Sequence, residues 1–395
     1  MDTPQPVIVS ACRTAIGNFL GGLSSFTATQ LGAIAIKEAV KRAGIDPAKI
    51  EEVIMGQVVQ AGVGQAPARQ AAIHAGIPPE VVALTINKVC GSGLKAAMMA
   101  SASIKAGDGD CYVVGGMESM SGTPYVLHGA KGGLKFGDKK LQDSMILDGL
   151  WDSFNNFHMG NAAELTVVKA GLTREEQDEF AANSHAKALA AIEAGKFVKE
   201  IVPVEIPQRK GDPVIFKQDE CPRPGTTVEK LAKLRPAFQK DGTVTAGNAP
   251  GLNDGAAAMV VTSADFAKQN GLKPLAKITG YAAAGVEPKD IFFSPIYAVR
   301  KLMNKLDADI NYFDLIEANE AFAAQALADG KGLGWDWDRV NVHGGAVALG
   351  HPIGASGARI VATLIYALQD RGLKTGLATL CLGGGNAVAM SIELM

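Results

Sequence analysis

The sequence lacks the charge excess, the long apolar run and the basic leader that mark several classes of protein. Its 395 residues carry 38 Lys and Arg against 40 Asp and Glu, a formal net charge of -2. Nucleic-acid binders normally show a basic patch, so this balance argues against that class. The strongest candidate for a membrane span, Ile360–Leu368, has roughly half the 18 or so residues required. Residues 1–14 have no basic stretch before an apolar one, so we expect no secretory signal.

Cysteine is sparse and widely spaced. The 5 cysteines include no Cys-x-x-Cys pair, so the sequence indicates neither a zinc site nor a disulfide framework. We therefore expect no metal, and a cytoplasmic location fits the cysteine usage best. Glycine is abundant: it makes up 46 of the 395 residues, well above its usual share of about 7%. Many glycines form short clusters between apolar runs, where the backbone turns tightly or approaches another group closely.

Strand-like and helix-like stretches alternate at both ends of the chain. Residues 7–10 have the pattern of a buried strand, residues 31–43 that of a helix ended by Gly44, and residues 111–114 that of a short strand. This alternation predicts a layered α/β fold with a mainly parallel sheet. The last part of the chain repeats the first, since each has a glycine-rich turn, a long helix and a strand that enters a glycine cluster. We therefore predict two duplicated halves, each with a five-stranded sheet.

The middle of the chain has a different character. Prolines and polar residues increase, and Thr173 with Glu176 forms a capping-box pattern before a helix that extends to about residue 194. We interpret this region as an inserted loop domain that covers the layered core. The predicted division is residues 1–121 plus 248–272 for the N-terminal half, 122–247 for the loop domain and 273–395 for the C-terminal half.

Cys90 is the first candidate for chemistry. It follows a predicted strand and begins Cys90-Gly91-Ser92-Gly93, directly before a helix. The positive end of the helix dipole favours a thiolate, so we expect a lowered pKa and a nucleophilic sulfur. Glycines beside it leave backbone N–H groups free to bind an oxyanion. The alternative is a buried cysteine with a packing role only.

Three further residues have settings that suit catalysis. Cys381 ends a strand just before three glycines, and His351 lies between glycines, where it is able to serve as a base for a thiol. Asn319 follows a strand, at the end where α/β folds place their sites. Its alternative role is that of a helix N-cap. His343 is a weaker rival of His351, and His185 is expected to be exposed on its helix.

Together these segments resemble the thiolase family over essentially the whole chain. Five motifs match in the family's order and spacing: Cys90–Ala96, Gly115–Ser121, Asn319–Phe322, Gly350–Gly357 and Cys381–Gly385. A single motif of this kind can arise by chance, whereas the ordered set of five is highly specific.

The resemblance implies a role for each matched catalytic residue. Cys90 would carry an acyl group and be activated by His351, and Cys381 would move the proton on the α-carbon of a second thioester. Asn319 would hold a water that forms one oxyanion hole with His351, and the N–H groups of Cys90 and Gly383 would form the other. The implied reaction converts two acetyl-CoA to acetoacetyl-CoA and coenzyme A, reversibly, with no metal or redox cofactor.

The middle segment resembles the family's loop domain, which covers coenzyme A. By that resemblance six residues would contact coenzyme A or the acyl group: His158, Met159, Arg223, Phe238, Ala246 and Phe322. The His158-Met159 pair is similar to the short-chain biosynthetic members, and the bulk of Met159 would disfavour long acyl chains.

Three segments depart from the family pattern. Pro250 stands where many members have a serine that binds the pantetheine arm, so we expect that contact to be lost. Phe292 and Phe293 replace a methionine- and glycine-rich run, and we expect them to reshape the acyl pocket. Ala387 replaces a glycine and is expected to alter the turn behind Cys381.

Other functions compete with a short-chain thiolase. A degradative 3-ketoacyl-CoA thiolase shares the catalytic set and accepts longer acyl groups. A Cys/His hydrolase would use Cys90, His351 and Asn319 but would leave Cys381 without a role. A non-catalytic acyl-CoA carrier would need none of these residues. The family also implies a homo-oligomer, commonly a tetramer and sometimes a dimer.

Overall fold

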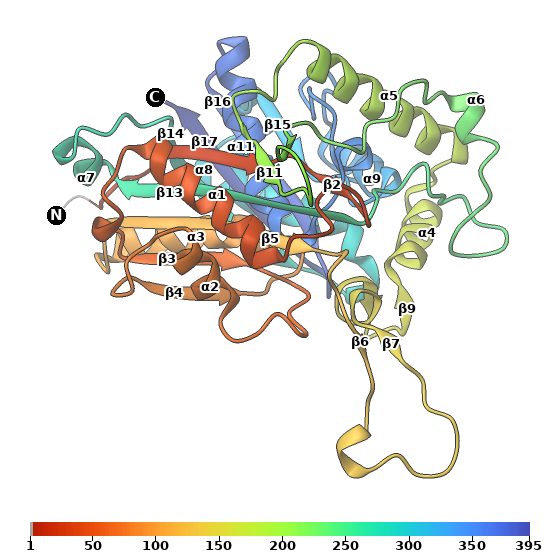
Figure 1. Cartoon of the computed structure of the whole chain (residues 1–395). Helices are drawn as coiled ribbons and strands as arrows, with labels where there is room; N and C mark the ends of the chain where they lie inside the picture. The colour runs from red at the N-terminus through yellow and green to blue at the C-terminus, as the bar shows by residue number, and fades with distance from the viewer. Residues whose placement is uncertain (1–2) are drawn as a thin grey trace.

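The computed structural model describes residues 3–395 and is built around one eleven-stranded sheet (Figure 1). Its long strands follow the order β15-β16-β17-β14-β1-β13-β5-β3-β4, and the two-residue strands β10 and β2 pair with β1 and β13. The strands are β1 (Pro6–Thr14), β2 (Gly17–Asn18), β3 (Glu52–Gly56), β4 (Val82–Ile86), β5 (Cys111–Ser119), β10 (Ile201–Val202), β13 (Asn253–Ser263), β14 (Ala276–Gly285), β15 (Leu315–Ala318), β16 (Thr375–Leu382) and β17 (Asn386–Leu394).

The sheet consists of two halves with the same internal order. In the first half, β1, β13, β5 and β3 are joined by antiparallel, antiparallel and parallel pairing in turn. In the second half, β14, β17, β16 and β15 repeat the same sequence of pairings. The halves meet where β1 pairs antiparallel with β14. The predicted layered α/β fold of duplicated halves is therefore confirmed.

The expected mainly parallel sheet is wrong, because five of the eight pairings along this strand order are antiparallel. Parallel pairing requires a crossover, usually a helix, whereas β17 follows β16 through a tight turn at residues 383–385. Five long strands are present in the N-terminal half, as predicted. The C-terminal half has four, with a single parallel bridge between Ile316 and Val340 beyond β15.

The helices of the two halves form three layers around this sheet. They are α1 (Ala28–Ala43), α2 (Pro67–His74), α3 (Ser92–Ala106), α7 (Ala264–Gln269), α8 (Ser294–Leu306), α9 (Ala323–Leu333), α10 (Ala346–Leu349) and α11 (Ile353–Arg371). α3 and α11 pack between the two half-sheets, α1 and α2 cover the outer face of the first half, and α8 covers that of the second. Strand alternation separates the layers, since Val7 and Val9 face α1 while Ile8 faces the central helices.

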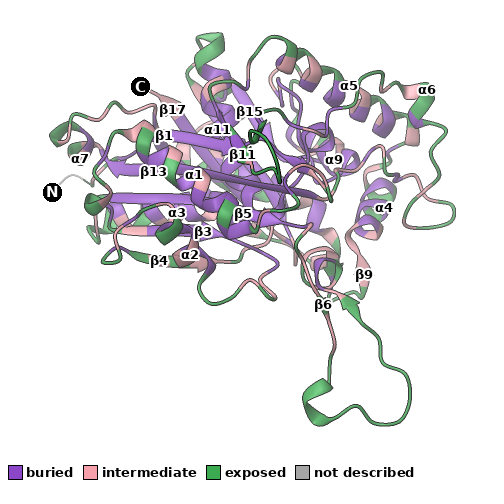
Figure 2. Cartoon of the chain, viewed as in Figure 1, coloured by how far each residue is buried: buried purple, intermediate pink, exposed green. Residues whose placement is uncertain are grey.

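The loop domain lies at one side of the sheet and contains α4, α5 and α6 (Figure 1). Its elements are β6 (Tyr125–Val126), β7 (Gln142–Asp143), β8 (Trp151–Asp152), β9 (Phe157–His158), α4 (Met159–Ala170), α5 (Arg174–Glu193), β11 (Val204–Ile206), β12 (Val214–Phe216) and α6 (Val228–Leu231). The predicted capping box of Thr173 and Glu176 opens α5. Residues 128–142 are exposed throughout and project from the body as an arm (Figure 2). The predicted domain boundaries themselves stay a prediction.

None of the helices within residues 3–395 has the length and apolarity needed to cross a membrane. The Ile360–Leu368 run belongs to α11, whose side chains are buried between the two half-sheets.

Candidate active site

Cys90 lies on a strained turn between β4 and α3. The preceding Val89 has φ +47, a left-handed conformation that a β-branched residue rarely adopts. The Ser92 hydroxyl donates to the Val89 carbonyl (2.7 Å) and accepts from the Lys88 N–H (2.9 Å). Backbone strain of this kind persists only where neighbours hold it, and it is concentrated at functional sites. The turn presents Cys90 to a cavity of about 430 Å³.

Close contact between α3 and α11 brings separate catalytic candidates together. A Cβ on Gly93 would lie 2.6 Å from the Ala358 nitrogen, and one on Gly357 would lie 2.4 Å from the Leu94 nitrogen. The two helices therefore touch backbone to backbone near their first turns. As a result Cys90, ahead of α3, and His351, ahead of α11, line the same cavity.

Cys381 reaches this cavity from the end of β16. The hairpin to β17 depends on Gly384 (φ +79) and Gly385 (φ +80), which take the left-handed backbone that favours glycine. Cys381 is buried, and its pKa is raised well above the ordinary value, first by burial and then by the charge of Cys90. Both cysteines line the same cavity, and an ionised Cys90 would disfavour a thiolate at Cys381.

The expected low pKa of Cys90 is wrong for the resting site. Burial raises the pKa of this thiol to about 12, although the N–H groups of Cys90 and Gly383 act in the opposite direction. The expectation rested on the local helix dipole, which is weaker than the cost of burying a thiolate. Cys90 therefore requires a base to remove its proton.

Alkylation of Cys90 by iodoacetamide should accelerate about tenfold per pH unit from about pH 6 to about pH 9, because the thiolate fraction rises in that proportion below the pKa. Mass spectrometry of the peptide that contains Cys90 would follow the reaction separately from the other thiols. A plateau near neutral pH would show that the thiolate is already formed, in agreement with the dipole argument instead.

His351 is held in the tautomer that a base requires. Its Nδ1 lies 2.6 Å from the Ser356 hydroxyl, which itself donates to the Pro352 carbonyl (2.9 Å). Because that hydroxyl proton is already used, Nδ1–H donates to Ser356 and Nε2 keeps its lone pair. Burial, followed by the charge of Arg359, lowers the pKa of His351 to about 3, so the ring is neutral at physiological pH. The His351 N–H donates to Asn253 Oδ1 (2.8 Å).

Asn319 lies beyond the end of β15, where its N–H donates to the Thr379 carbonyl (3.0 Å). The N-cap alternative is wrong, because Phe322 occupies the N-cap position of α9. The Asn319 side chain is fully buried, yet neither of its amide atoms finds a partner among residues 3–395. A buried amide without partners is unfavourable, so this group is suited to hold a ligand or a water.

The cavity collects nearly all of the predicted site residues. Its lining includes Cys90, His351, Cys381, Gly383, His158, Met159, Arg223, Phe238, Ala246 and Phe322. Asn319 is the exception, since it is fully buried and does not line the cavity. The catalytic and binding roles of these residues stay predictions.

Aromatic rings form one wall of the cavity. His158 stacks on Phe238 with ring centroids 4.9 Å apart, and Phe238 meets Phe322 edge to face at 6.1 Å. Phe292 continues this wall, 5.3 Å from Phe322. His158 Nδ1 accepts from the Gly160 N–H (3.0 Å) at the start of α4, so its Nε2–H is left as a donor.

The departures from the family pattern divide into two groups. Pro250 and Phe292 line the cavity. Phe293 and Ala387 instead pack in the cluster on the outer face of the second half-sheet, and Ala387 pairs with Cys381 in the sheet register. Only the first group is therefore in a position to change the cavity directly.

Several supporting residues escape prediction from the sequence. Glu118 is buried and accepts from the N–H groups of Val58 (3.0 Å) and Gly354 (2.9 Å), which fixes the start of α11. Burial raises the pKa of Glu118 to about 7. His185, expected to be exposed, is buried, and its Nδ1 accepts from the Arg223 N–H (3.2 Å). The sequence of α5 does not predict this contact, because Arg223 lies 38 residues further along the chain than His185.

Two thiols, a neutral imidazole and paired N–H groups around one cavity fit a class of enzyme that transfers acyl groups through cysteine. The chain matches the family model "Thiolase, N-terminal domain" over residues 6–265 and "Thiolase, C-terminal domain" over residues 272–394. The chain belongs to the thiolase family.

Similar proteins match over nearly the whole chain. Proteins from Pseudomonas aeruginosa and Cupriavidus necator, both named acetyl-CoA acetyltransferase, are each 57% identical, with 98% of both chains covered. The crystal structure of the Bacillus anthracis acetyl-CoA acetyltransferase superposes with a TM-score of 0.97 at 46% identity and covers 100% of this chain and 99% of that one.

Proposed function

We propose that this thiolase condenses two acetyl-CoA molecules to acetoacetyl-CoA and free coenzyme A, reversibly, as a short-chain acetyl-CoA acetyltransferase. The observation that carries the proposal is the placement of Cys90, Cys381 and His351 around one cavity. The names of the similar proteins support the same substrate.

The first half-reaction moves one acetyl group to Cys90. His351 Nε2 takes the thiol proton, and the thiolate attacks the carbonyl carbon of acetyl-CoA. The oxyanion of the tetrahedral intermediate is held by the N–H groups of Cys90 and Gly383, preorganised donors that lower the barrier. The intermediate collapses as the C–S bond to coenzyme A breaks, and His351 returns the proton to the departing thiolate.

The second half-reaction forms the carbon–carbon bond. Cys381 gives its proton to His351 Nε2 and, as thiolate, removes a proton from the α-carbon of a second acetyl-CoA. The enolate oxygen is stabilised by the Nε2–H of the protonated His351 and by a water on the Asn319 amide. The carbanion attacks the acetyl group on Cys90, the C–S bond to Cys90 breaks, and the departing Cys90 thiolate takes the proton from His351. No metal or redox cofactor takes part, because coenzyme A is only substrate and product.

The charge state of Cys90 matters for the second half-reaction. An ionised Cys90 would raise the pKa of Cys381 further, after burial. In the acetyl-enzyme Cys90 is a neutral thioester, so it does not oppose the ionisation of Cys381.

The aromatic wall of the cavity favours substrates with short acyl chains. Phe292 is 2% exposed and packs in the same buried cluster as Cys381 and Phe322. A longer acyl chain beside Cys381 would have to displace one of these rings. This placement favours the short-chain reaction over a degradative thiolase of broad range.

The test is thiolysis with free coenzyme A, in which acetoacetyl-CoA is compared with six-carbon 3-ketohexanoyl-CoA. We expect kcat/KM to favour acetoacetyl-CoA by at least about tenfold, the scale of misfit in an apolar pocket. Phe292→Ala should reduce that preference, and Phe293→Ala, whose ring lies outside the cavity, should not. Equal rates on both substrates would contradict the short-chain proposal.

The proposal also includes an oligomeric state and a cellular compartment for this protein. A homo-oligomer, dimer or tetramer, is supported by β4, an edge strand on which Val82 and Leu84 are exposed, since free strand edges tend to pair. Leu134, Phe136 and Leu141 of the projecting arm are also exposed and apolar. The cytoplasm remains the expected compartment, because five widely spaced, unpaired thiols suit reducing conditions.

A further inference from the structure

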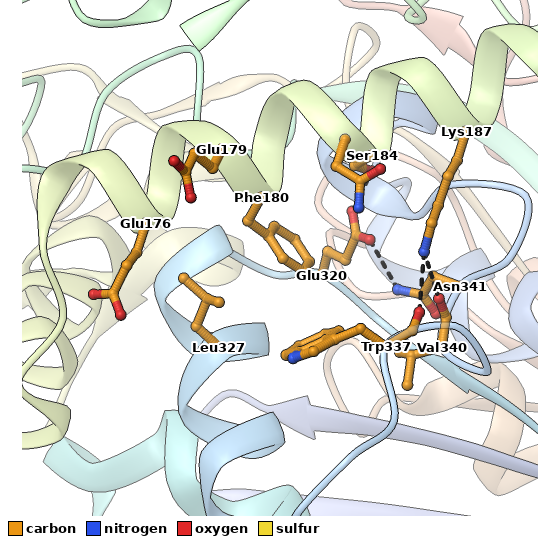
Figure 3. Close-up of a pocket in the computed structure, with 11 residues that line it drawn as sticks. Glu176, Glu179, Phe180, Ser184, Lys187, Glu320, Leu327, Trp337, Val340 and Asn341 are labelled. Carbon is orange, nitrogen blue, oxygen red and sulfur yellow. Dashed lines mark hydrogen bonds between the residues drawn. The ribbon is translucent and has the colours of Figure 1, made fainter.

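Glu320, the residue after Asn319, is buried but fully engaged (Figure 3). Its Oε1 accepts from Asn341 Nδ2 (2.8 Å), and its Oε2 accepts from the Ser184 hydroxyl (2.8 Å) and the Val347 N–H (3.0 Å). These three donors belong to α5, to α10 and to the loop before α10. A single carboxylate therefore joins three separate segments directly behind Asn319.

The partners of Glu320 are themselves fixed. Asn341 bonds both the N–H (2.9 Å) and the carbonyl (2.8 Å) of Ala318, the residue before Asn319. Gly345 packs so tightly that a Cβ there would lie 2.2 Å from Glu320 Oε1. The backbone on each side of Asn319 is thus anchored, on one side through Ala318 and on the other through Glu320.

The same contacts extend into the loop domain. The Ser184 hydroxyl accepts from the Gly345 N–H (3.1 Å), and the next residue, His185, holds the backbone of Arg223. Two neighbouring residues of α5 therefore have different partners. Ser184 contacts the segment that follows Asn319, and His185 holds Arg223, a predicted coenzyme A contact.

We propose that Glu320 is a positioning residue for condensation, acting through Asn319. The inference rests on the proposed function, in which Asn319 holds the water that stabilises the enolate. His351 has its own supports in Ser356 and Asn253, and the oxyanion hole of the acylation step is made by other groups. Loss of Glu320 contacts should therefore slow condensation while Cys90 is still acetylated.

The substitution Glu320→Gln keeps the shape and removes one acceptor. Its amide nitrogen would face either the Asn341 donor or the Ser184 and Val347 donors, so at least one bond is lost. The substitution leaves the hydrogen bonds of the neighbouring Lys187 intact. The Lys187 ammonium donates to the carbonyls of Trp337 (3.2 Å) and Val340 (3.1 Å) and not to Glu320 (Figure 3).

The chain offers a matched control at the other end of β15. Asp314 accepts from the N–H groups of Lys374 (2.9 Å) and Thr375 (2.8 Å) and from the Thr375 hydroxyl (2.8 Å). Asp314→Ala removes all three of these bonds directly before β15, at the end of the strand away from Asn319. It therefore reports the effect of lost stability alone.

Single-turnover acetylation of Cys90 and steady-state condensation are measured for both variants, together with their thermal unfolding. For Glu320→Gln we expect condensation to fall about 10- to 100-fold, the scale of a small misplacement, with acetylation within about threefold of the unsubstituted protein. For Asp314→Ala both steps should stay near their starting rates. Ser184→Ala, a milder change, should shift condensation in the same direction and serves if Glu320→Gln fails to fold.

A double-mutant cycle with Asn319→Ala makes the test specific. If Glu320 acts through Asn319, Glu320→Gln should slow condensation little further once Asn319 is alanine. Additive losses, or equal losses in acetylation and condensation, would overturn the positioning role. If the unsubstituted protein makes no acetoacetyl-CoA, the proposed function fails first. If it does and Glu320→Gln matches it, only the positioning role fails.

Discussion

Replacing Cys90 by serine should abolish acyl-enzyme formation. Burial already raises the pKa of the Cys90 thiol to about 12, and an alcohol at the same place would ionise less readily still. We expect turnover to fall by at least about 10³-fold, the scale seen when a nucleophile is removed. Intact-protein mass spectrometry after incubation with acetyl-CoA would measure the acetyl group directly.

The control for this variant is Cys111→Ser. Cys111 is buried in β5 and does not line the cavity, so its loss removes a thiol without removing the nucleophile. Full acetylation of the Cys90→Ser protein outside the peptide that contains position 90 would show that another residue carries the acyl group, and the assignment of Cys90 would be lost.

Replacing Cys381 by serine should separate the two half-reactions. Cys90 should still accept an acetyl group, because its base is His351 and its oxyanion donors are backbone N–H groups. Condensation should fall by about 10²- to 10⁴-fold, the usual contribution of a general acid–base group. Rapid-quench measurement of acetyl-Cys90 beside acetoacetyl-CoA formation gives both rates.

An equal loss in both rates would contradict this role for Cys381. It would mean that the residue supports the site structurally or shares the first step. The buried position of Cys381, next to Leu382 and close to Cys90, makes this comparison necessary.

The sequence predicts the elements whose signals are local. The capping box of Thr173 and Glu176 marks the start of α5, and the glycine clusters mark the turns at Cys90 and Cys381. Gly93 and Gly357 appear only as parts of motifs, yet they permit the backbone contact that brings the two halves of the site together. Local pattern was sufficient to identify these residues, although not to explain their spacing in three dimensions.

Features that depend on distant contacts were not predictable in the same way. The buried state of His185 comes from Arg223, and the high pKa of Cys90 comes from the whole enclosure of the cavity rather than from its helix. β13 carries a run of small and apolar residues without alternation, because it is buried on both faces between β1 and β5. Such strands pair antiparallel with their neighbours and make the sheet mixed. The alternation of strands and helices in the sequence does not reveal this pairing.

A single incubation of the unsubstituted protein with acetyl-CoA alone tests the proposed condensation in one step. We predict one acetyl group on the peptide that contains Cys90, together with acetoacetyl-CoA and free coenzyme A in equal amounts as turnover proceeds. Release of acetate without acetoacetyl-CoA would indicate a hydrolase, and it would contradict the proposal that two thiols in one cavity join two acetyl groups.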